Sequence, residues 1–261
     1  MLEIEFAEAT DCGPVREHNE DFVGHTLPDN EEQARACGWI FTLADGVGGQ
    51  DRGEVASQMT VSTVLSEYGK TIKGETPSNR LSRAVQVANG AVYEAAHGGI
   101  ASTLVACALR FDRATIAHVG DSRCYLIRNG RPHRLTRDHT VANDQVRLGI
   151  FSEQESRRAA TKNVLSRSIG VNMFVSADIS EHPVRKGDLL LLCSDGLHGA
   201  ISDQEIARIA AADAPLSETV SRLIAIANRS DGGDNVSVQL IRVKNVEAVG
   251  MYRGRPYRIH A

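Results

Sequence analysis

Apolar and polar residues alternate along the chain in short blocks that predict a mixed α and β protein. Apolar, β-branched runs predict strands at Trp39–Ala44, Ser102–Leu109, Ala114–Val119, Ser122–Arg128, Asp188–Ser194 and Val236–Val243. Helical spacing predicts helices at Glu54–Gly69, Asn79–Ala96, Ser202–Ala211 and Leu216–Asn228. The helices come in pairs instead of alternating with the strands one for one. This order favours antiparallel sheets covered by helix pairs over a doubly wound parallel sheet.

Two of the predicted helices carry finer local patterns. The first keeps Val55, Met59, Ser62 and Leu65 or Ser66 on one face, which predicts an amphipathic helix. The third opens with the Ser-x-x-Glu pattern of a capping box at Ser202. Between strands and helices, Thr140–Lys162 is polar and only weakly periodic, so we expect a surface excursion there. Residues 246–261 are expected to form a trailing tail.

Composition narrows the class of protein. The 261 residues are 42% hydrophobic and 24% charged, which is ordinary for a soluble globular protein and excludes a disordered chain. Lys and Arg number 29 against 33 Asp and Glu, a net charge of −4 without a basic block, which argues against nucleic acid as a partner. No apolar run approaches the roughly 20 residues that span a bilayer, so we expect no membrane association.

The cysteines point to a reducing compartment. There are five, an odd number, and no two form a Cys-x-x-Cys pair, which argues against a disulfide framework and against a thiolate zinc site. The acidic N-terminus lacks the pattern of a signal peptide. We therefore expect a cytoplasmic, monomeric, single-domain protein.

Aspartates stand where the predicted strands end. Asp45 follows one strand, Asp121 lies between two, Asp195 follows another and Asp234 precedes the last. A single Asp-Gly or Gly-Asp dipeptide is most often a turn. If the strands pack side by side, however, the carboxylates converge and repel one another unless a cation neutralises them. Such oxygen ligands suit magnesium, manganese or calcium better than zinc.

Other motifs add chemistry or exclude it. Arg16 stands close to Glu20 and Asp21, and its guanidinium matches phosphate oxygens bidentately, although a solvated charge run is the alternative. The glycines of Asp45–Gly49 are not followed by Gly-Lys-Ser/Thr, so they do not form a nucleotide P-loop. They would instead let the backbone approach a metal or phosphate closely. No nucleophile elbow or zinc-spaced His/Cys cluster is present.

Taken in order, these motifs resemble those of the metal-dependent (PPM) Ser/Thr protein phosphatases, the protein phosphatase 2C type, and most of all the compact bacterial members. The resemblance covers about residues 4–243. It is carried by Asp11-Cys12-Gly13-x-x-Arg16-x-x-Asn19-Glu20-Asp21, Ala44-Asp45-Gly46-Val47-Gly48-Gly49, Gly120-Asp121-Ser122-Arg123, Leu135-Thr136-x-Asp138-His139, Leu165-Ser166-Arg167-Ser168-Ile169-Gly170, Ser194-Asp195-Gly196-Leu197 and Asp234-Asn235-Val236-Ser237.

The resemblance implies an α+β fold, a four-layer αββα sandwich of two antiparallel sheets flanked by pairs of helices. The catalytic domain would span residues 1–245, with a flap at about 140–162 and a C-terminal tail at 246–261. The resemblance also implies a role for each site residue. Asp45 would bridge two metal ions, and the Gly46 carbonyl, Asp195 and Asp234 would complete the shell of the first ion. Glu20 and Asp21 would serve the second ion directly or through water, Asp121 would help to hold a third, looser ion, and Arg16 would bind the phosphate.

The implied activity is hydrolysis of phosphoserine and phosphothreonine by a water activated at Mn²⁺ or Mg²⁺. Phosphorylated proteins would be the substrates, a bacterial Ser/Thr kinase and its targets among them. Val47 occupies the place of a histidine that many eukaryotic members carry as a general acid. The proton would then come from elsewhere, such as a metal-bound water. His139 is another candidate donor, with a structural role in its turn as the alternative. His18, His118 and His198 are expected to be structural.

Two alternatives to this activity stay open at the level of the sequence. One is a non-catalytic module of the same fold that binds phosphoproteins. The other is a partner-switching phosphatase that acts on an anti-sigma antagonist, although relatives of that kind usually carry sensory domains.

Overall fold

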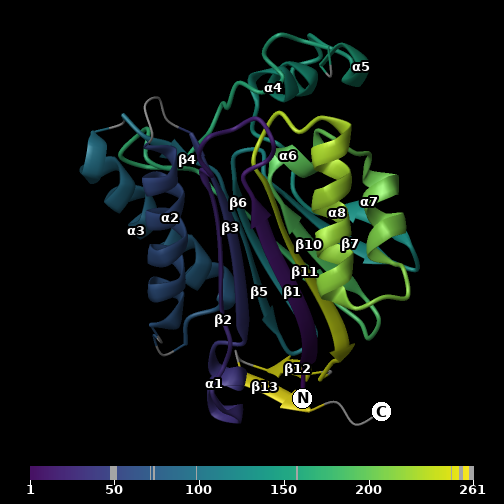
Figure 1. Cartoon of the computed structure of the whole chain (residues 1–261). Coiled ribbons are helices and arrows are strands. Elements are labelled where there is room, and N and C mark those ends of the chain that lie inside the picture. Colours follow the sequence, from purple (N-terminus) through teal and green to yellow (C-terminus); the bar gives the residue numbers. More distant parts are fainter. Residues whose placement is uncertain are drawn as a thin grey trace.

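A computed structural model describes residues 1–47, 52–70, 72, 74–97, 99–156, 158–247, 249–252 and 255–258. Two antiparallel sheets face each other in the middle of the molecule, and helices cover their outer faces (Figure 1). The predicted αββα sandwich is therefore confirmed. Gly48 and Gly49 of the glycine-rich motif lie outside the described residues.

The two sheets are built from strands that lie far apart in the sequence. The first sheet has the order β1 (Glu3–Asp11), β11 (Val236–Asn245), β10 (Leu189–Cys193), β7 (Arg123–Arg128) and β8 (Arg131–Arg134). The second has the order β2 (Asp21–Thr26), β3 (Trp39–Val47), β5 (Leu104–Arg110), β6 (Arg113–Val119) and β9 (Asp178–Pro183), with the short β4 (Ala101–Ser102) also paired to β3. Every predicted strand is present, with small shifts at its ends.

Helix pairs cover the two outer faces. Helices α2 (Gly53–Gly69) and α3 (Pro77–Ala96) pack on the second sheet, and α7 (Asp203–Ala210) and α8 (Leu216–Ser230) pack on the first. The predicted cap of α7 is present, because the Ser202 hydroxyl accepts a hydrogen bond from the Glu205 amide at 3.3 Å. No helix in the described part of the chain is long and apolar enough to cross a membrane.

The remaining elements lie at the ends of the sandwich. Helices α4 (Val141–Arg147) and α5 (Glu153–Ser156) project beyond one end (Figure 1), as expected of a surface excursion at residues 140–162. The short α6 (Asp195–His198) follows β10 beneath them. Helix α1 (Glu31–Ala36) lies at the opposite end, together with a hairpin of β12 (Val249–Tyr252) and β13 (Arg255–Arg258). The predicted tail thus contains a paired hairpin.

Alternation along the central strands explains their unbroken apolar sequence. In β10, Leu190 and Leu192 pack between the two sheets, whereas Leu189 and Leu191 pack against the helices. A strand that is buried on both faces needs apolar residues at every position. Each buried leucine contributes roughly 1.5–3 kcal/mol to folding. The sandwich is thereby rigid enough to hold polar groups at its end.

The face that α2 buries differs from the sequence prediction. Met59 and Leu65 of the predicted face are partly buried against the core, but Val55 is 43% exposed and Ser62 is exposed as well. The buried stripe runs through Ala56, Thr60 and Val64, one position further round the helix. Small side chains let α2 pack closely against β3 and α3, and the Thr60 hydroxyl is satisfied because it donates to the Ala56 carbonyl at 2.7 Å.

Candidate active site

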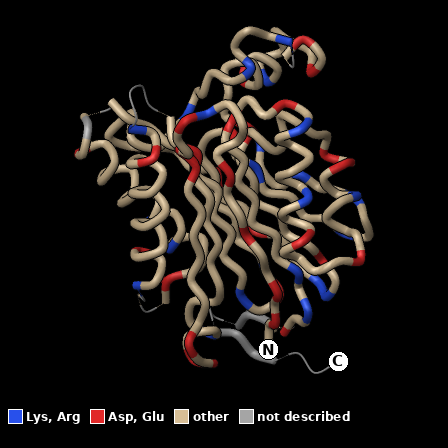
Figure 2. The backbone as a smooth tube through the Cα atoms, in the orientation of Figure 1, with Lys and Arg blue, Asp and Glu red and all other residues tan. Residues whose placement is uncertain are grey.

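Acidic residues gather at the end of the sandwich beneath α4 and α5 (Figure 2). The pairing of β2 with β3 sets Asp21 directly opposite Asp45. Asp195 opens α6 after β10, and Asp234 stands just before β11. Asp45 is close enough to Asp21, Asp195, Asp121 and Asp234 for the charge of each to raise its pKa. The predicted convergence of the strand-end aspartates is therefore present in the structure.

Burial and mutual repulsion perturb these carboxyl groups. Burial raises the pKa of Asp21 to about 7, and the negative charges of Asp195 and Asp234 raise it further. Hydrogen bonds from Ser194 and Ser237 act in the opposite direction. Burial, followed by the charges of Asp21 and Asp195, raises the pKa of Asp45 well above its usual range. Burial and then the charge of Asp234 raise the pKa of Asp195 to about 6. Such a cluster is costly to hold ionised without a cation.

The donor set fits a hard divalent cation. Oδ1 of Asp21 and Oδ1 of Asp195 are buried, and neither has a hydrogen-bond partner in the described part of the chain. A buried carboxylate oxygen without a partner is unfavourable, and a cation would satisfy it. Among the described residues, no three His, Cys, Asp and Glu side chains form a sufficient ligand group by themselves. Further oxygen donors, such as the Gly46 carbonyl, would have to complete the shell.

The orientation of Asp21 is fixed by the first sheet. The Ser194 hydroxyl donates to Asp21 Oδ2 at 2.7 Å and accepts from the Ser237 amide at 3.0 Å. Ser237 in turn donates to the Thr10 hydroxyl at 2.7 Å. These bonds occupy Oδ2 of Asp21 and leave its buried Oδ1 without a hydrogen-bond partner in the described part of the chain.

Glu20 lies beside this cluster but has a partner of its own. Its Oε1 accepts from the amide of Gly53, the first residue of α2, at 3.1 Å, and its backbone carbonyl accepts from the Gly46 amide at 3.0 Å. A Cβ at Gly46 would lie 2.0 Å from the Gly53 carbonyl oxygen, so this approach requires glycine. Helix α2 has no side-chain cap from its own N-cap residue, and Glu20 supplies one.

Arg16 reaches the cluster from the N-terminal loop. Its Nη2 lies 2.9 Å from Asp234 Oδ1, and its Nε donates to the Gly233 carbonyl at 3.1 Å. The Arg16 side chain is 48% exposed, so its guanidinium is fixed at the rim of the cluster and remains open to solvent.

Asp121 lies in the turn between β6 and β7. It is 8% exposed, and burial, with the charges of Asp195 and Asp138, raises its pKa to about 7. The turn is tied to Asp45 because the Thr103 hydroxyl accepts from the Asp45 amide at 2.9 Å and lies 2.6 Å from the Ser122 hydroxyl. Asp121 is therefore held beside the cluster and is more than an exposed turn residue.

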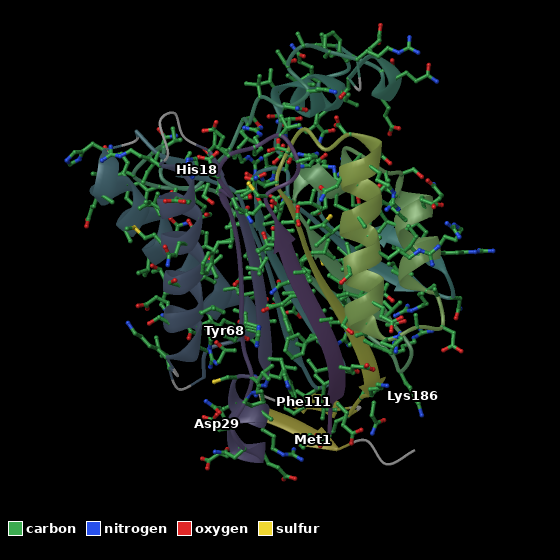
Figure 3. The ribbon with its side chains drawn as sticks, in the orientation of Figure 1. Met1, His18, Asp29, Tyr68, Phe111 and Lys186 are labelled. Atoms are coloured by element: carbon green, nitrogen blue, oxygen red, sulfur yellow. The ribbon has the colours of Figure 1, made fainter. Side chains whose placement is uncertain are left out.

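Asn235 holds the N-terminal loop in place, a positioning role that reasoning from the sequence did not assign to it. It is 5% exposed. Its amide group donates to the carbonyls of Cys12 at 2.9 Å and His18 at 3.0 Å, and its Oδ1 accepts from the Glu20 amide at 2.8 Å. Figure 3 shows His18 at this end of the molecule, away from Tyr68 and Phe111. Asn235 thus holds the loop that carries Arg16. The only indication of this role in the sequence was its position next to Asp234 in the motif.

The two residues discussed for proton transfer take different positions. His139 is 1% exposed, and its Nδ1 accepts from the Gly120 amide at 3.2 Å while its Nε2 faces Asp178 Oδ2 at 3.2 Å. Both ring nitrogens are engaged, which favours the structural role over that of a proton donor. Val47 is 46% exposed and provides no proton.

A cleft of about 930 Å³ opens over the aspartates. Asp121, Asp195 and Asp234 line its floor, and residues of the 140–162 segment, Glu153 and Lys162 among them, line its other side. The projecting segment therefore borders the space through which a substrate would reach the acidic cluster.

Comparison with known proteins agrees with this geometry. The family model described as "Protein phosphatase 2C" matches residues 9–236. The protein phosphatase PhpP of Streptococcus pneumoniae is 32% identical over 251 residues, which are 94% of this chain and 100% of PhpP. The serine/threonine phosphatase Stp of Listeria monocytogenes is 34% identical over 240 residues, covering 89% of this chain and 93% of Stp.

Solved structures show the same likeness. A serine/threonine phosphatase of Streptococcus agalactiae superposes with a TM-score of 0.85 at 32% identity and covers 93% of this chain and 100% of that one. The catalytic domain of the phosphatase PstP, solved with two manganese ions, gives a TM-score of 0.80 at 30% identity over 94% and 100% of the two chains.

The fold and the site define a metal-dependent protein serine/threonine phosphatase of bacterial type. The chain belongs to the protein phosphatase 2C family. The resemblance found in the sequence is confirmed at the level of family and enzyme class.

Proposed function

We propose that this phosphatase hydrolyses phosphoserine and phosphothreonine in proteins at a binuclear Mn²⁺ or Mg²⁺ centre, and that it opposes a bacterial Ser/Thr kinase. The observation that carries the binuclear centre is the acidic cluster itself. Its carboxyl groups lie close together, and Oδ1 of Asp21 and Oδ1 of Asp195 are buried without a hydrogen-bond partner in the described part of the chain. PhpP and Stp, whose names state the phosphatase activity, support the substrate class.

Each predicted site residue has a proposed role at this centre. Asp45, Asp195, Asp234 and the Gly46 carbonyl would hold the first ion, Asp45 with Glu20 and Asp21 the second, and Asp121 a third. When bound, the ions lower the pKa of water in the site and offset the negative charge of the phosphate.

The protein itself supplies orientation and charge. The Arg16 guanidinium, fixed at the rim by Gly233, would bind the equatorial oxygens of the phosphate and align it over the cluster. The cleft would hold the polypeptide on either side of the phosphorylated residue, with the 140–162 segment along one wall. Asn235 keeps the Arg16 loop in register with Asp234.

Metal-dependent turnover tests the proposed centre directly. The full chain should hydrolyse p-nitrophenyl phosphate and phosphoserine peptides with Mn²⁺, lose activity in EDTA, and regain it when Mn²⁺ is added. Asp45→Asn should be inactive, whereas Asp213→Asn, the same change at an exposed loop position, should retain activity. Calorimetry should count at least two ions per chain. An inactive wild type that still binds phosphopeptides would favour the non-catalytic module.

A cellular comparison tests the opposition to a kinase. Phosphoproteomes would be compared between a strain that lacks the gene, its parent, and the deletion strain complemented with Asp45→Asn. Phosphoserine and phosphothreonine sites, including sites on a Ser/Thr kinase, should increase in the first and third strains. An increase restricted to one anti-sigma antagonist would favour the partner-switching role. A cytoplasmic location and a monomeric state remain predictions from the sequence.

A further inference from the structure

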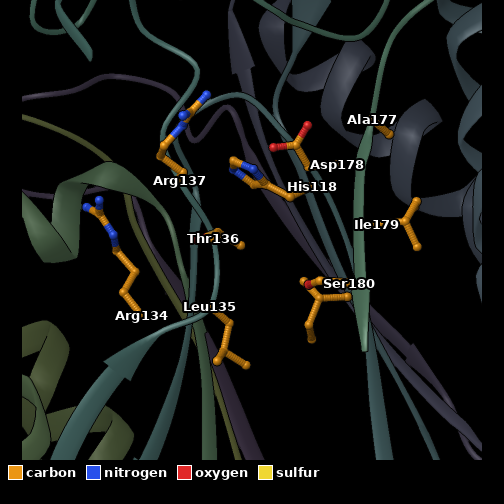
Figure 4. A pocket seen from close by; sticks show the side chains of 10 residues that line it. His118, Arg134, Leu135, Thr136, Arg137, Ala177, Asp178, Ile179 and Ser180 are labelled. Atoms are coloured by element: carbon orange, nitrogen blue, oxygen red, sulfur yellow. The ribbon is translucent and has the colours of Figure 1, made fainter. Parts of the chain in front are cut away.

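A second cavity, of about 560 Å³, opens at the edge of the sandwich (Figure 4). Strand β6 contributes Ile116 and His118 to its lining, the segment 134–137 forms one wall, and residues 177–180 at the start of β9 form the other. The volume falls within the roughly 300–1,000 Å³ that small-molecule sites occupy. None of the residues proposed to hold metal ions lines this cavity.

His118 is the unusual group in this cavity. It is 1% exposed, and neither of its ring nitrogens has a hydrogen-bond partner in the described part of the chain. Figure 4 shows its ring directed away from β6 and toward the 134–137 segment, with Asp178 beside it. Buried polar groups without a partner are uncommon in native proteins, and each one needs an explanation.

The protonation state of His118 defines what it can bind. Burial, and then the charge of the neighbouring His139, lowers the pKa of His118 to about 3, against the charges of Asp138 and Asp178 and the backbone of Ser122. The imidazole is therefore neutral near pH 7. A neutral imidazole offers one donor and one acceptor, which suits a hydroxyl or an N–H group and does not suit a bare cation or anion.

The charge of the lining favours an anion. Arg137 is exposed and makes no ion pair with any described residue. Arg134 lies 3.6 Å from Asp138, which already receives a bidentate pair of hydrogen bonds from Arg123. The carboxylate of Asp178 is itself paired, at 2.9 Å from Arg167. Arg137 is thus the charged group of the lining that no described carboxylate neutralises.

We propose that this cavity binds a small organic anion. A carboxylate or phosphate group would lie beside the guanidinium of Arg137, which matches the oxygens of both groups. An apolar body would contact Ile116 and Leu135, which pack in the same cluster between the two sheets, and a hydroxyl or N–H group would reach His118. The site lies outside the proposed catalytic centre and does not depend on that function.

The cavity is nevertheless close to the catalytic machinery. Arg134 lines both this cavity and the cleft over the aspartates. The ring of His139 lies 4.7 Å from that of His118, and the His139 amide donates to the Gly120 carbonyl at 2.7 Å. A ligand that contacts His118 would therefore lie one side chain away from the turn that carries Asp121.

Ring signals of His118 provide the test. The Mg²⁺-loaded full chain, labelled with ¹⁵N in its histidine rings, would be titrated with benzoate, 4-hydroxybenzoate and phenylphosphonate. At least one probe should shift the His118 signals saturably, and 4-hydroxybenzoate should bind more tightly than benzoate because its hydroxyl can reach His118. Comparing the affinity of phenylphosphonate with that of benzoate shows whether the site prefers a phosphate-type head group or a carboxylate. Inhibition of p-nitrophenyl phosphate hydrolysis separately reports any binding at the catalytic centre.

Two variants and a control decide the outcome. Arg137→Gln, at an exposed position, should weaken binding about tenfold, the loss of one charge-assisted contact. Arg131→Gln, an exposed arginine of β8 outside the lining, should leave affinity unchanged. His118→Phe should abolish the preference for 4-hydroxybenzoate. Equal affinity in Arg137→Gln and wild type, shifts confined to the catalytic cleft, or no saturable shift of His118 with any of the three probes would overturn the proposal.

Discussion

The Nη2 atom of Arg16 lies 2.9 Å from Oδ1 of Asp234, so the proposed phosphate-binding group contacts a proposed metal ligand. Both side chains are exposed to solvent, at 48% and 40%, and an ion pair of this kind adds little to stability. Its significance is positional, because Nε of Arg16 is also held by the Gly233 carbonyl. If Asp234 holds a cation and Arg16 a phosphate as proposed, both groups would acquire new partners next to the position they already occupy.

Replacing Arg16 should therefore act on substrate capture. In Arg16→Ala, KM for p-nitrophenyl phosphate should rise more than kcat falls, since the guanidinium contacts charge that is present in both substrate and transition state. The loss in kcat/KM should be about 10–100-fold, the range of a charged hydrogen bond. Steady-state kinetics at saturating Mn²⁺ measure it, with Arg229→Ala on α8 as the control. A collapse of kcat at unchanged KM would contradict this role.

Neutralising Asp195 should disable the metal centre. Asp195→Asn preserves the size of the side chain but removes the charge that would hold a hard cation, so turnover should fall about 10²-fold to 10³-fold or more. Calorimetry with Mn²⁺ should show fewer bound ions or a large loss of affinity. Near-wild-type activity at saturating Mn²⁺ would contradict the assignment.

Asn235 should matter for both stability and activity. Asn235→Ala leaves the carbonyls of Cys12 and His18 and the amide of Glu20 without their partner, and unpaired buried groups cost about 1–3 kcal/mol each. We expect the free energy of unfolding to fall by about 2–4 kcal/mol in denaturant titrations. KM should also rise, because the Arg16 loop loses its anchor. Asn79→Ala, at an exposed position of α3, should change neither quantity.

Much of the fold could be predicted from the sequence because the central strands are buried on both faces. Runs such as the leucines of β10 are apolar at every position and are recognised without knowledge of their partners. Strands β1 and β9 were missed for the opposite reason. They lie at sheet edges, are only partly buried, and carry charged residues such as Glu8 and Glu181.

The residues of the site also fall into some that could be predicted from the sequence and others that could not. The aspartates were predictable because each stands at a strand end, a local feature of the chain. The groups that orient them were not, because their partners are remote: Ser194 bonds Asp21, and Asn235 bonds the loop of residues 12–20. Pairings over such distances follow from sheet order, and no local pattern contains that order.

Glu20 allows a structural role and a metal-binding role to be separated. Glu20→Gln can still accept from the Gly53 amide and should retain the cap of α2, whereas Glu20→Ala loses it and should lose about 1 kcal/mol of stability. If Glu20 also serves the second ion, both variants should require more Mn²⁺ for half-maximal activity. Thermal melts in EDTA measure the cap, and Mn²⁺ titrations of activity measure the ligand role. A normal Mn²⁺ requirement in Glu20→Gln would leave Glu20 as a cap alone.

Asp121 gives the sharpest dependence on pH. Burial raises its pKa from 3.8 to about 7 in the folded state, so the folded protein binds this proton more tightly than the unfolded chain does. The stability contributed by the protonated carboxyl is fully present below about pH 4 and is lost as pH rises through 7. In EDTA, Asp121→Asn should therefore melt at a higher temperature than wild type at pH 8, and this advantage should shrink toward pH 5.

Asp121→Asn should stabilise the metal-free protein but impair the enzyme when Mn²⁺ is bound. With Mn²⁺ bound, Asp121→Asn preserves the shape of the turn but removes the charge proposed to hold a third ion, so turnover should fall while the two core ions remain. Melting curves at both pH values and calorimetric ion counts on the same preparations measure the two effects. The buried His118 and His198 have lowered pKa values, so their contribution to stability depends on pH in the opposite sense. Both histidines are present in the wild type and in the variant, so their contributions cancel in the comparison. An Asp121→Asn protein with full activity and an unchanged ion count would leave Asp121 as a turn residue without a metal role.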